Sequence, residues 1–303
     1  MPGMDFKQLQ YFVQVAELGS FTRAAMVLKV AQPALSRQVR SLEVELRQNL
    51  FERNGRGVTL TDAGQRLLAH GRGILQQVQR AVLDLEAQRG APVGRLALGV
   101  PPSVGRMLTA PLVHQFRERF PKATLTMVEG LSTYVLEWLV QGRIDCAVVY
   151  NAAPNTLLDM APVLDERLYL LGARTRRTTR VLGASLNDVA TRELVIPSRP
   201  HSIRMLLETT LAGAGLKPRI GLEIESVPAI LDLVESGSVH AVLTRSALRG
   251  REAQFLARPI HITKGQPLTT TLWLATSAQR PRGPLLEQGS ELIRQMLLSL
   301  WND

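Results

Sequence analysis

Residues 20–43 read SFTRAAMVLKVAQPALSRQVRSLE, and this stretch decides how the first part of the chain folds. It contains four Lys and Arg residues and no Asp or Glu before its final glutamate. Ser20 is a favourable N-cap for a helix that runs to about Leu28. Pro33 is tolerated in the first turn of a helix and disfavoured in its interior, so a second helix begins near the break KVAQP. The stretch therefore predicts two short helices joined by a tight turn.

The second of these helices has two unlike faces. Leu35, Val39, Leu42 and Leu46 recur at helical spacing and form a stripe that we expect to be buried. The opposite face is small, polar and basic, and consists of Gln32, Pro33, Ser36, Arg37 and Arg40. A solvated helix face normally mixes acidic with basic residues, whereas a face that approaches DNA phosphates excludes carboxylates. Arg and Gln can also donate the paired hydrogen bonds that distinguish guanine and adenine in the major groove. The pattern is typical of a helix-turn-helix.

A hairpin is predicted after the second helix. The turn signal NGRG, residues 54–57, lies between two short extended segments. Arg53 and Arg56 at this turn favour a wing beside the DNA-reading helix, with arginine placed for a phosphate or the minor groove. On these residues alone, an ordinary polar hairpin tip remains the alternative.

A long helix is predicted from Thr61, a favourable N-cap, to about Arg89, because no proline interrupts this segment. Its apolar residues alternate in steps of four and three, which is the pattern of a heptad seam, weakened here by small residues. Such a helix either packs on its own domain or pairs with a second chain. We predict a dimer seam formed by Leu67, Ile74, Val78 and Leu85.

Short strands and helices alternate after a linker at residues 89–95. Apolar strand segments are predicted at 94–100, 123–130, 144–151, 166–173, 193–198, 219–226, 239–248 and 268–277. Helices are predicted between most of these segments and at the end of the chain, so we expect parallel sheets in an α/β region.

Polar residues gather where these strands end, which is where open α/β sheets bind ligands. The residues predicted to contact an effector there are Pro101, Pro102, Ser103, Leu131, Ser132, Tyr150, Asn151, Pro197, Ser198, Arg199, His201, Ser202 and Thr244. Ser103, Ser132 and Ser202 lie at helix N-termini, where free backbone N–H groups favour an anion. We therefore predict a small polar or anionic effector. Each serine can also be read as a helix cap alone, Arg199 as a solvated cation and His201 as an ordinary first-turn residue.

Composition indicates a soluble chain of two or three domains, with 303 residues, 45% hydrophobic and 20% charged. The formal net charge is +10, and residues 1–90 hold 12 Lys and Arg against 8 Asp and Glu, so the basic excess is only slightly denser there. The single cysteine, Cys146, excludes an internal disulfide and fits a reducing cytoplasm. We expect no signal peptide, no membrane span and no metal site.

The motifs disfavour an enzyme. GVPPSVG, residues 99–105, follows a predicted strand but lacks the lysine of a P-loop and the spacing of a dinucleotide fingerprint. The sequence contains neither a GxSxG nucleophile elbow nor an evident pair of catalytic carboxylates. We expect no cofactor and no catalytic residues.

Two motifs together resemble the DNA-binding region of LysR-type transcriptional regulators. These are GSFTRAAMVLKVAQPALSRQVRSLEVEL, residues 19–46, and LFERNGRGVTLTDAG, residues 50–64. Both are specific to that family, and the resemblance covers essentially the whole chain. VPPSVGRMLTAPLVHQFRERFP, residues 100–121, is most similar to the branch that includes nitrogen-assimilation-control regulators.

The resemblance implies a winged helix-turn-helix at 1–60, a linker and dimerisation helix at 61–90, and a two-lobed α/β effector domain at 91–303 that is similar to periplasmic binding proteins. It implies one lobe near 93–162 and 268–303 and the other near 163–267, with Ser103 and Ser132 touching the effector. The predicted DNA-binding residues are Ser20, Thr22, Arg23, Gln32, Pro33, Ala34, Ser36, Arg37, Arg40, Arg53 and Arg56.

The resemblance further implies a bacterial cytoplasmic protein that binds promoter DNA as a homodimer, assembles into a homotetramer and recruits RNA polymerase in response to its effector. Two other functions stay open: a ligand-independent architectural DNA binder, and a solute-binding protein with an incidental basic N-terminus. The long second half disfavours the first, because DNA bending requires no pair of α/β lobes. The acid-free helix disfavours the second.

Overall fold

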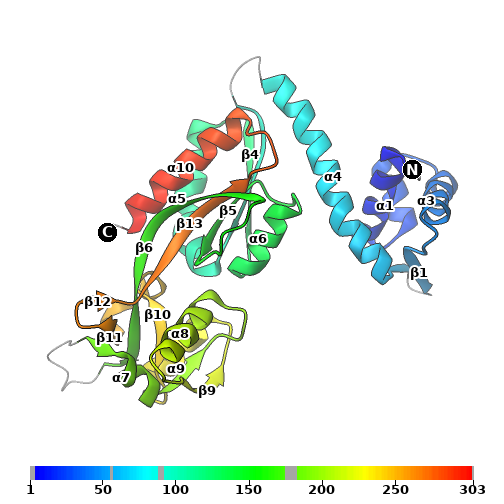
Figure 1. The fold of residues 1–303 in the computed structure, drawn as a ribbon. Helices are drawn as coiled ribbons and strands as arrows, with labels where there is room; N and C mark the ends of the chain where they lie inside the picture. The colour runs from blue at the N-terminus through cyan, green and yellow to red at the C-terminus, as the bar shows by residue number, and fades with distance from the viewer. Residues whose placement is uncertain (1–3, 55–56, 88–91, 175–182, 302–303) are drawn as a thin grey trace. The chain divides into compact units, whose positions relative to one another are not determined.

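The computed structural model describes residues 4–54, 57–87, 92–174 and 183–301. Contacts divide the chain into two units, Met1–Gly90 with Gln141–Arg143, and Ala91–Val140 with Ile144–Asp303. The first unit is mainly helical, and the second contains two α/β lobes (Figure 1). None of the helices in the described ranges is long and apolar enough to cross a bilayer.

The first unit contains the two helices that the opening stretch predicts, α2 (Phe21–Leu28) and α3 (Gln32–Leu46). Its other elements are α1 (Phe6–Leu18), the strands β1 (Phe51–Asn54) and β2 (Gly57–Leu60), and α4 (Asp62–Ala87). The Asp5 side chain caps α1, and the Ser20 hydroxyl caps α2 by accepting from the Arg23 N–H. β1 and β2 pair as an antiparallel hairpin. The predicted helix-turn-helix followed by a hairpin is confirmed.

The turn between α2 and α3 depends on Lys29, which has φ 53° and ψ 44°. This left-handed conformation costs a non-glycine residue roughly 1–2 kcal/mol. The Lys29 N–H donates to carbonyls of the preceding turn, which ends α2. α3 then begins at Gln32, so Pro33 occupies its first turn, where the missing N–H costs nothing.

Three of the four residues predicted for the stripe of α3 are buried, since Leu35, Val39 and Leu42 are at most 1% exposed, whereas Leu46 is half-buried. Leu35 and Val39 pack with Tyr11, Val15, Ala24 and Ala25, whereas Leu42 packs with Leu9, Phe12, Val13 and Leu50. The loop after α3 is held by Glu43, whose Oε1 accepts the N–H groups of Leu50 (2.8 Å) and Phe51 (3.2 Å). The helix is therefore fixed from one face and at its end.

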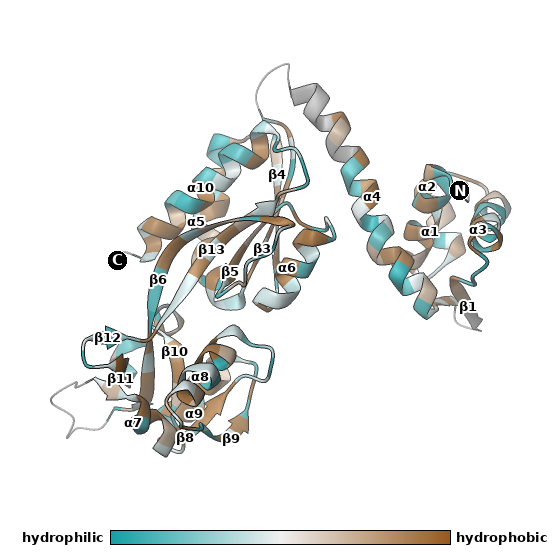
Figure 2. Ribbon diagram, viewed as in Figure 1, coloured by the Kyte–Doolittle hydropathy of each residue, from teal (hydrophilic) through white to brown (hydrophobic). Residues whose placement is uncertain are grey.

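The first lobe of the second unit is built on parallel strands. It contains β3 (Gly94–Val100), α5 (Pro102–Arg119), β4 (Ala123–Glu129), α6 (Ser132–Val140), β5 (Cys146–Tyr150) and α10 (Pro284–Trp301). β3 lies between β4 and β5 and pairs in parallel with both. Side chains of α5 and α10 share one core with the sheet, and α6 packs in a second core. Figure 2 shows the strands of this lobe as largely hydrophobic, as expected of a sheet covered on both faces.

The second lobe is a smaller α/β unit with its own cores. Its strands are β7 (Ala184–Ser185), β8 (Glu193–Ile196), β9 (Arg219–Glu223), β10 (Ala241–Thr244), β11 (Phe255–Thr263) and β12 (Gln266–Pro267). Its helices are α7 (Leu186–Thr191), α8 (Ser202–Gly213), α9 (Val227–Glu235) and the short 3-10 turns η1 (Ser246–Leu248) and η2 (Glu252–Gln254).

One long strand, β6 (Leu158–Ala173), belongs to both lobes. Its first part pairs antiparallel with β13 (Thr269–Ser277), and its last part pairs with β10 and β11. The chain thus passes between the lobes along β6 and returns into β13 (Figure 1). A cavity lies between the lobes on the side of their helix N-termini.

We predict that Leu42→Ala lowers the free energy of unfolding of the N-terminal unit by about 2–5 kcal/mol, because it leaves a cavity at a fully buried position. The measurement is urea unfolding of the full chain followed by circular dichroism. Val44→Ala is the matched control on the same helix, since Val44 is 69% exposed. Equal losses for the two variants would contradict the assigned core.

Candidate DNA-reading surface and ligand cleft

The face of α3 opposite its buried stripe is open to solvent. Gln32, Pro33, Arg37 and Arg40 are exposed, whereas Ala34 and Ser36 are half-buried. The first acidic residue of α3 is Glu43, in its C-terminal half, and its carboxylate is turned to the backbone of the following loop. The first part of α3 therefore presents donors and positive charge and has no carboxylate of its own, as DNA contact requires.

The start of α2 supplies the other predicted DNA-binding residues. Thr22 and Arg23 are exposed, and Ser20 is half-buried because it caps the helix. The Arg23 guanidinium donates to the Leu18 carbonyl (2.5 Å), so part of its donor capacity is engaged at the end of α1. In the predicted wing, Arg53 lies in β1 opposite Val58, and Arg56 lies outside the described residues.

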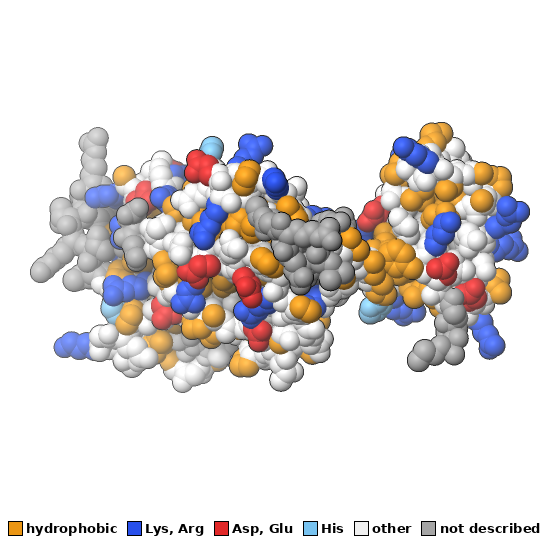
Figure 3. Space-filling model, turned by 90° about the horizontal axis from the view of Figure 1, so that it is seen from above, with side chains coloured by type: hydrophobic (Ala, Val, Ile, Leu, Met, Phe, Trp, Pro, Cys, Tyr) orange, Lys and Arg blue, Asp and Glu red, His pale blue; other side chains and the backbone are white. Residues whose placement is uncertain are grey.

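The predicted seam residues of α4 have different surroundings. Leu67 is half-buried and packs against the core of the N-terminal unit. Ile74, Val78 and Val82 are 41%, 42% and 52% exposed, which is unusual for large apolar side chains that recur at helical spacing. Leu85 lies in the last turns of α4. Figure 3 shows hydrophobic side chains gathered on the surface of this unit.

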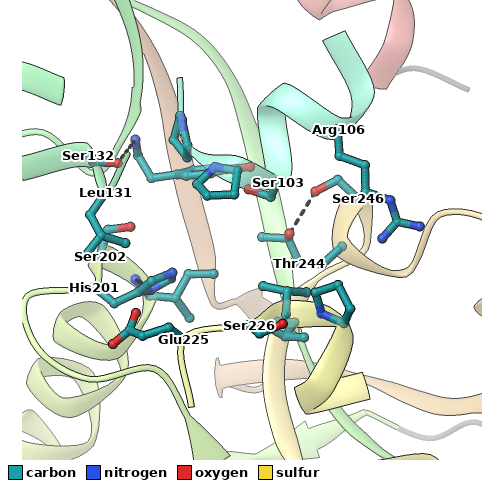
Figure 4. Close-up of a pocket in the computed structure, with 18 residues that line it drawn as sticks. Ser103, Arg106, Leu131, Ser132, His201, Ser202, Glu225, Ser226, Thr244 and Ser246 are labelled. Carbon is teal, nitrogen blue, oxygen red and sulfur yellow. Dashed lines mark hydrogen bonds between the residues drawn. The ribbon is translucent and has the colours of Figure 1, made fainter. Parts of the chain in front are cut away.

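The cavity between the two lobes has a volume of about 430 Å³. Nine residues predicted for the effector site line it, namely Pro101, Pro102, Ser103, Leu131, Ser132, Tyr150, His201, Ser202 and Thr244. Figure 4 shows lining residues from both lobes, with Ser103 from the start of α5 and Ser202 from the start of α8. The expectation that ligands bind where strands end thus identified residues that are far apart in the sequence but line one cavity.

Tyr150 organises the floor of this cavity. Its hydroxyl donates to Glu166 Oε2 (3.0 Å), and its backbone N–H donates to Ser132 Oγ (3.0 Å). Burial, and then the neighbouring Glu166 charge, raise the pKa of Tyr150, so the phenol stays protonated. Glu166 Oε1 accepts the Ser246 N–H from the second lobe (3.2 Å). A carboxylate on the shared strand β6 therefore joins the first lobe to the second.

His201 caps α8 and borders the cavity. Its Nδ1 accepts the Ile203 N–H (3.3 Å), which requires that nitrogen to be unprotonated. Burial lowers the pKa of His201, and the carboxylate of Glu225 opposes that shift. The imidazole is therefore neutral near pH 7, with its remaining proton on Nε2.

Four residues predicted for the effector site do not line the cavity, and each has other contacts. Asn151 has φ 46° and exchanges hydrogen bonds with the Thr271 backbone of β13. The Pro197 carbonyl accepts from Arg204, the Ser198 N–H donates to Glu225, and Arg199 pairs with Glu208 (2.7 Å). Of these contacts, the hydrogen bond from Ser198 reaches a lining residue, Glu225.

Sequence reasoning missed several residues of the cleft, among them Arg106, Glu166, Glu225, Ser226 and Ser246. Arg106 follows Ser103 by three positions on one helix, so helical spacing could have revealed it. Glu166 and Ser246 reach the site only through the pairing of β6 with β10, which no local pattern indicates. Within the described ranges, no group of His, Cys, Asp and Glu side chains could hold a metal ion.

Two family models match the chain. One, described as bacterial regulatory helix-turn-helix protein, lysR family, matches residues 6–65. The other, described as LysR substrate binding domain, matches residues 89–298, which is more than half of the chain. The chain belongs to the LysR family. It is a transcriptional regulator of that family, with the DNA-binding unit and the effector-binding domain that the sequence predicted.

Relatives within the LysR family include the nitrogen assimilation regulatory protein nac of Escherichia coli (strain K12), 32% identical over 298 residues, which are 98% of this chain and 95% of that protein. The nac protein of Klebsiella aerogenes is 34% identical over 98% of this chain and 95% of its own length. The predicted similarity to nitrogen-assimilation-control regulators is confirmed.

Solved LysR-family structures have the same fold. The structure of CbnR is 26% identical with a TM-score of 0.69, and covers 96% of this chain and 99% of its own. CbnR has also been solved in complex with its target DNA, with a TM-score of 0.70 over the same shares. A full-length OxyR variant of Pseudomonas aeruginosa, 24% identical with a TM-score of 0.74, covers 96% of this chain and 94% of its own and supports the fold alone.

We predict that the LysR-family chain loses stability as the pH falls below about 6.5, the ordinary histidine pKa. Because the folded pKa of His201 is lowered, the unfolded chain binds its proton first, so acid favours unfolding. Burial also lowers the pKa of His240, which adds to the effect. His201→Asn keeps a capping side chain and should flatten the fall in unfolding free energy between about pH 7 and pH 5. An unchanged pH slope would contradict the neutral imidazole.

Proposed function

We propose that this regulator reads DNA with the exposed face of α3 and adjusts its DNA complex when a small effector enters the cleft between its lobes. The observation that carries the proposal is that one chain contains both an acid-free helix face and a cleft lined by residues of both lobes. An enzyme is not proposed, because the family models describe regulators and the cleft is explained by ligand binding.

For DNA binding, Arg37 and Gln32 are the proposed base-reading residues, because both are exposed and can form paired hydrogen bonds in the major groove. The small residues Pro33, Ala34 and Ser36 allow α3 to lie deep in the groove. Arg40, together with Ser20, Thr22 and Arg23 of α2, is proposed to contact phosphates, and Arg53 and Arg56 to contact phosphates or the minor groove.

We predict that Arg37→Ala lowers the preference for operator over unrelated DNA by about 1–3 kcal/mol, the contribution of one good bidentate base contact. Fluorescence anisotropy on operator and scrambled duplexes at several salt concentrations measures it. Arg47→Ala is the matched control, since Arg47 is an exposed arginine at the opposite end of α3. A uniform loss on both duplexes would assign Arg37 to phosphate contact instead.

For effector binding, we propose that hydroxyls and helix N-termini hold an anionic group of the ligand. Ser103 lies in the first turn of α5, Ser132 begins α6 and Ser202 begins α8. Because Ser132 Oγ accepts the Tyr150 N–H, its own proton is free to be donated to a ligand. The free N–H groups of these helix ends add to the attraction for an anion.

We predict that Ser103→Ala with Ser132→Ala abolishes the thermal shift that small carboxylates produce in the wild-type chain. Ser132→Ala also orphans the buried Tyr150 N–H, so the unliganded melting temperature should fall as well. The readout is therefore the ligand-induced shift, compared with Ser236→Ala, which removes a hydroxyl from the exposed end of α9. A full ligand response in the double variant would remove both serines from the site.

For assembly, we propose that the exposed residues Ile74 and Val78 of α4, continued by Val82 and Leu85, form a seam with a second copy of the chain. The resulting homodimer would present two α3 helices to successive half-sites. In the proposed mechanism, dimers pair further into a homotetramer, which bends bacterial promoter DNA in the cytoplasm. The bent complex then recruits RNA polymerase. The effector acts only if it binds two states of this assembly with different affinity.

We predict that Ile74→Glu with Val78→Glu raises the dimer dissociation constant by about tenfold or more, because it buries charge in an apolar seam. Sedimentation equilibrium measures it. Gln65→Glu, which adds charge at an exposed position near the start of α4, is the control. An unchanged dissociation constant would place the dimer contact elsewhere.

A DNA complex that no ligand alters would favour the architectural alternative.

A further inference from the structure

The described lining of the cleft contains few charged side chains. Among its described lining residues, Arg106 is the basic side chain and Glu225 the acidic one, and the buried Glu166 lies at its floor. Two further arginines near the second lobe are already paired. Arg199 pairs with Glu208 (2.7 Å), and Arg204 pairs with Glu208 (3.0 Å) and Glu223 (2.9 Å). The Arg106 guanidinium donates to the Arg249 carbonyl (2.9 Å), and Figure 4 shows it on the side of Ser246, away from Glu225. A ligand group beside Glu225 therefore meets a carboxylate rather than a spare cation.

Glu225 is the carboxylate that faces the cavity. Its Oε1 accepts the Ser198 N–H (3.1 Å), and in the described part of the chain it forms no salt bridge. His201 beside it does not compensate the charge, because its Nδ1 accepts the Ile203 N–H and the ring is neutral near pH 7. The cavity thus offers a charged acceptor with unused capacity.

The floor of the cavity has no proton to offer from Tyr150. Its hydroxyl donates a hydrogen bond to Glu166, and the Ser103 and Ser246 hydroxyls interact with the same phenol oxygen. Glu166 is 7% exposed, and its two oxygens are used by Tyr150 and by the Ser246 N–H. The acceptors at the floor are therefore already engaged, which leaves Glu225 as an acceptor with unused capacity.

The anion-binding groups lie beside Glu225. Figure 4 shows Ser132, Ser202, His201 and Glu225 along one side of the cavity, with Ser103, Thr244 and Ser246 toward the other. The helix N-termini at Ser132 and Ser202 favour a carboxylate, and Glu225 favours a cation close to it. One compact ligand head bearing both charges satisfies these requirements together.

The rest of the lining is apolar and suits a ligand with a hydrophobic body. The residues that form it include Pro101, Pro102, Leu131, Ile203, Val227 and Leu243. A volume of about 430 Å³ falls in the range of small-molecule sites. A strongly polar side chain on the ligand would lose its hydration against these walls.

We infer that the effector is an α-amino acid with an apolar side chain, held by its carboxylate at the Ser132 and Ser202 helix ends and by its ammonium group at Glu225. This inference rests on the proposed ligand function of the cleft. The inferred ligand differs from a simple anionic effector because it also carries an ammonium group. The apolar side chain of the ligand lies along the proline, leucine and isoleucine walls.

Isothermal titration calorimetry on the full-length chain tests the amino-acid inference. The ligands are L-valine, L-leucine, L-isoleucine, L-methionine and L-phenylalanine. Each amino acid is compared with its deaminated acid, for example L-leucine with 4-methylpentanoate, at up to millimolar concentration. We expect at least one amino acid to bind about tenfold more tightly than its deaminated acid, the effect of one charge-assisted hydrogen bond. Glu225→Gln should remove this difference. Glu118→Gln, an exposed position on α5, should change neither.

Three results would overturn the inference: equal or tighter binding of the deaminated acids, an ammonium preference that survives Glu225→Gln, or no binding of any amino acid in the panel. The proposed function is judged separately. If small carboxylates bind and Ser103→Ala with Ser132→Ala abolishes their binding, the ligand cleft stands although its amino-acid specificity fails. If no small acid of either kind binds, both fail.

Discussion

The aliphatic stripe of α3 is the contact on which the DNA-binding unit depends. Leu35, Val39 and Leu42 are fully buried, and they pack into two neighbouring cores made with α1, α2 and the start of the hairpin. Because a helix repeats every 3.6 residues, fixing this stripe also fixes the opposite face. Arg37 and Arg40 are exposed for the same reason that Leu35 is buried. The hydrophobic effect thus positions side chains that make no apolar contact themselves.

A comparable constraint operates in the second unit, where one continuous strand joins two lobes that have separate cores. β6 pairs with β13 in one lobe and with β10 and β11 in the other, so the lobes share a strand. The Glu166 carboxylate on this strand bonds the Tyr150 hydroxyl from one lobe and the Ser246 N–H from the other. Relative movement of the lobes would stretch these two hydrogen bonds, which places the floor of the cleft at the junction that a ligand would influence.

Features with local causes could be predicted from the sequence, and features with tertiary causes could not. The helices α2 and α3 were predictable because caps, proline and apolar spacing act within a few residues. Ser103, Ser132 and Ser202 were found because strand ends and helix starts coincide. Asn151 obeys the same strand-end rule, yet its amide bonds the Thr271 backbone of β13, a partner 120 positions away.

Glu166 and Glu225 are residues of the cleft that the sequence alone could not reveal. Both lie in ordinary strand or loop sequence, and only the pairing of distant strands brings them to the cleft. Phe51 similarly contacts Phe12 across the N-terminal unit, with ring centroids 5.3 Å apart. Glu166 and Glu225 determine the chemistry of the cleft. The structure therefore changed the predicted class of effector more than it changed the predicted fold.

The central claim is that the acid-free face of α3 lies in the major groove. Because Cys146 is the single cysteine and is buried, Cys146→Ala provides a background for one introduced thiol. The most direct measurement attaches an iron chelate at Ser36→Cys and maps cleavage of operator DNA, with Val44→Cys on the exposed but acid-flanked side of the same helix as control. The predicted result is cleavage centred on the major groove of each half-site from position 36 and little from position 44. Equal cleavage from both positions, or none from position 36, would contradict the claim.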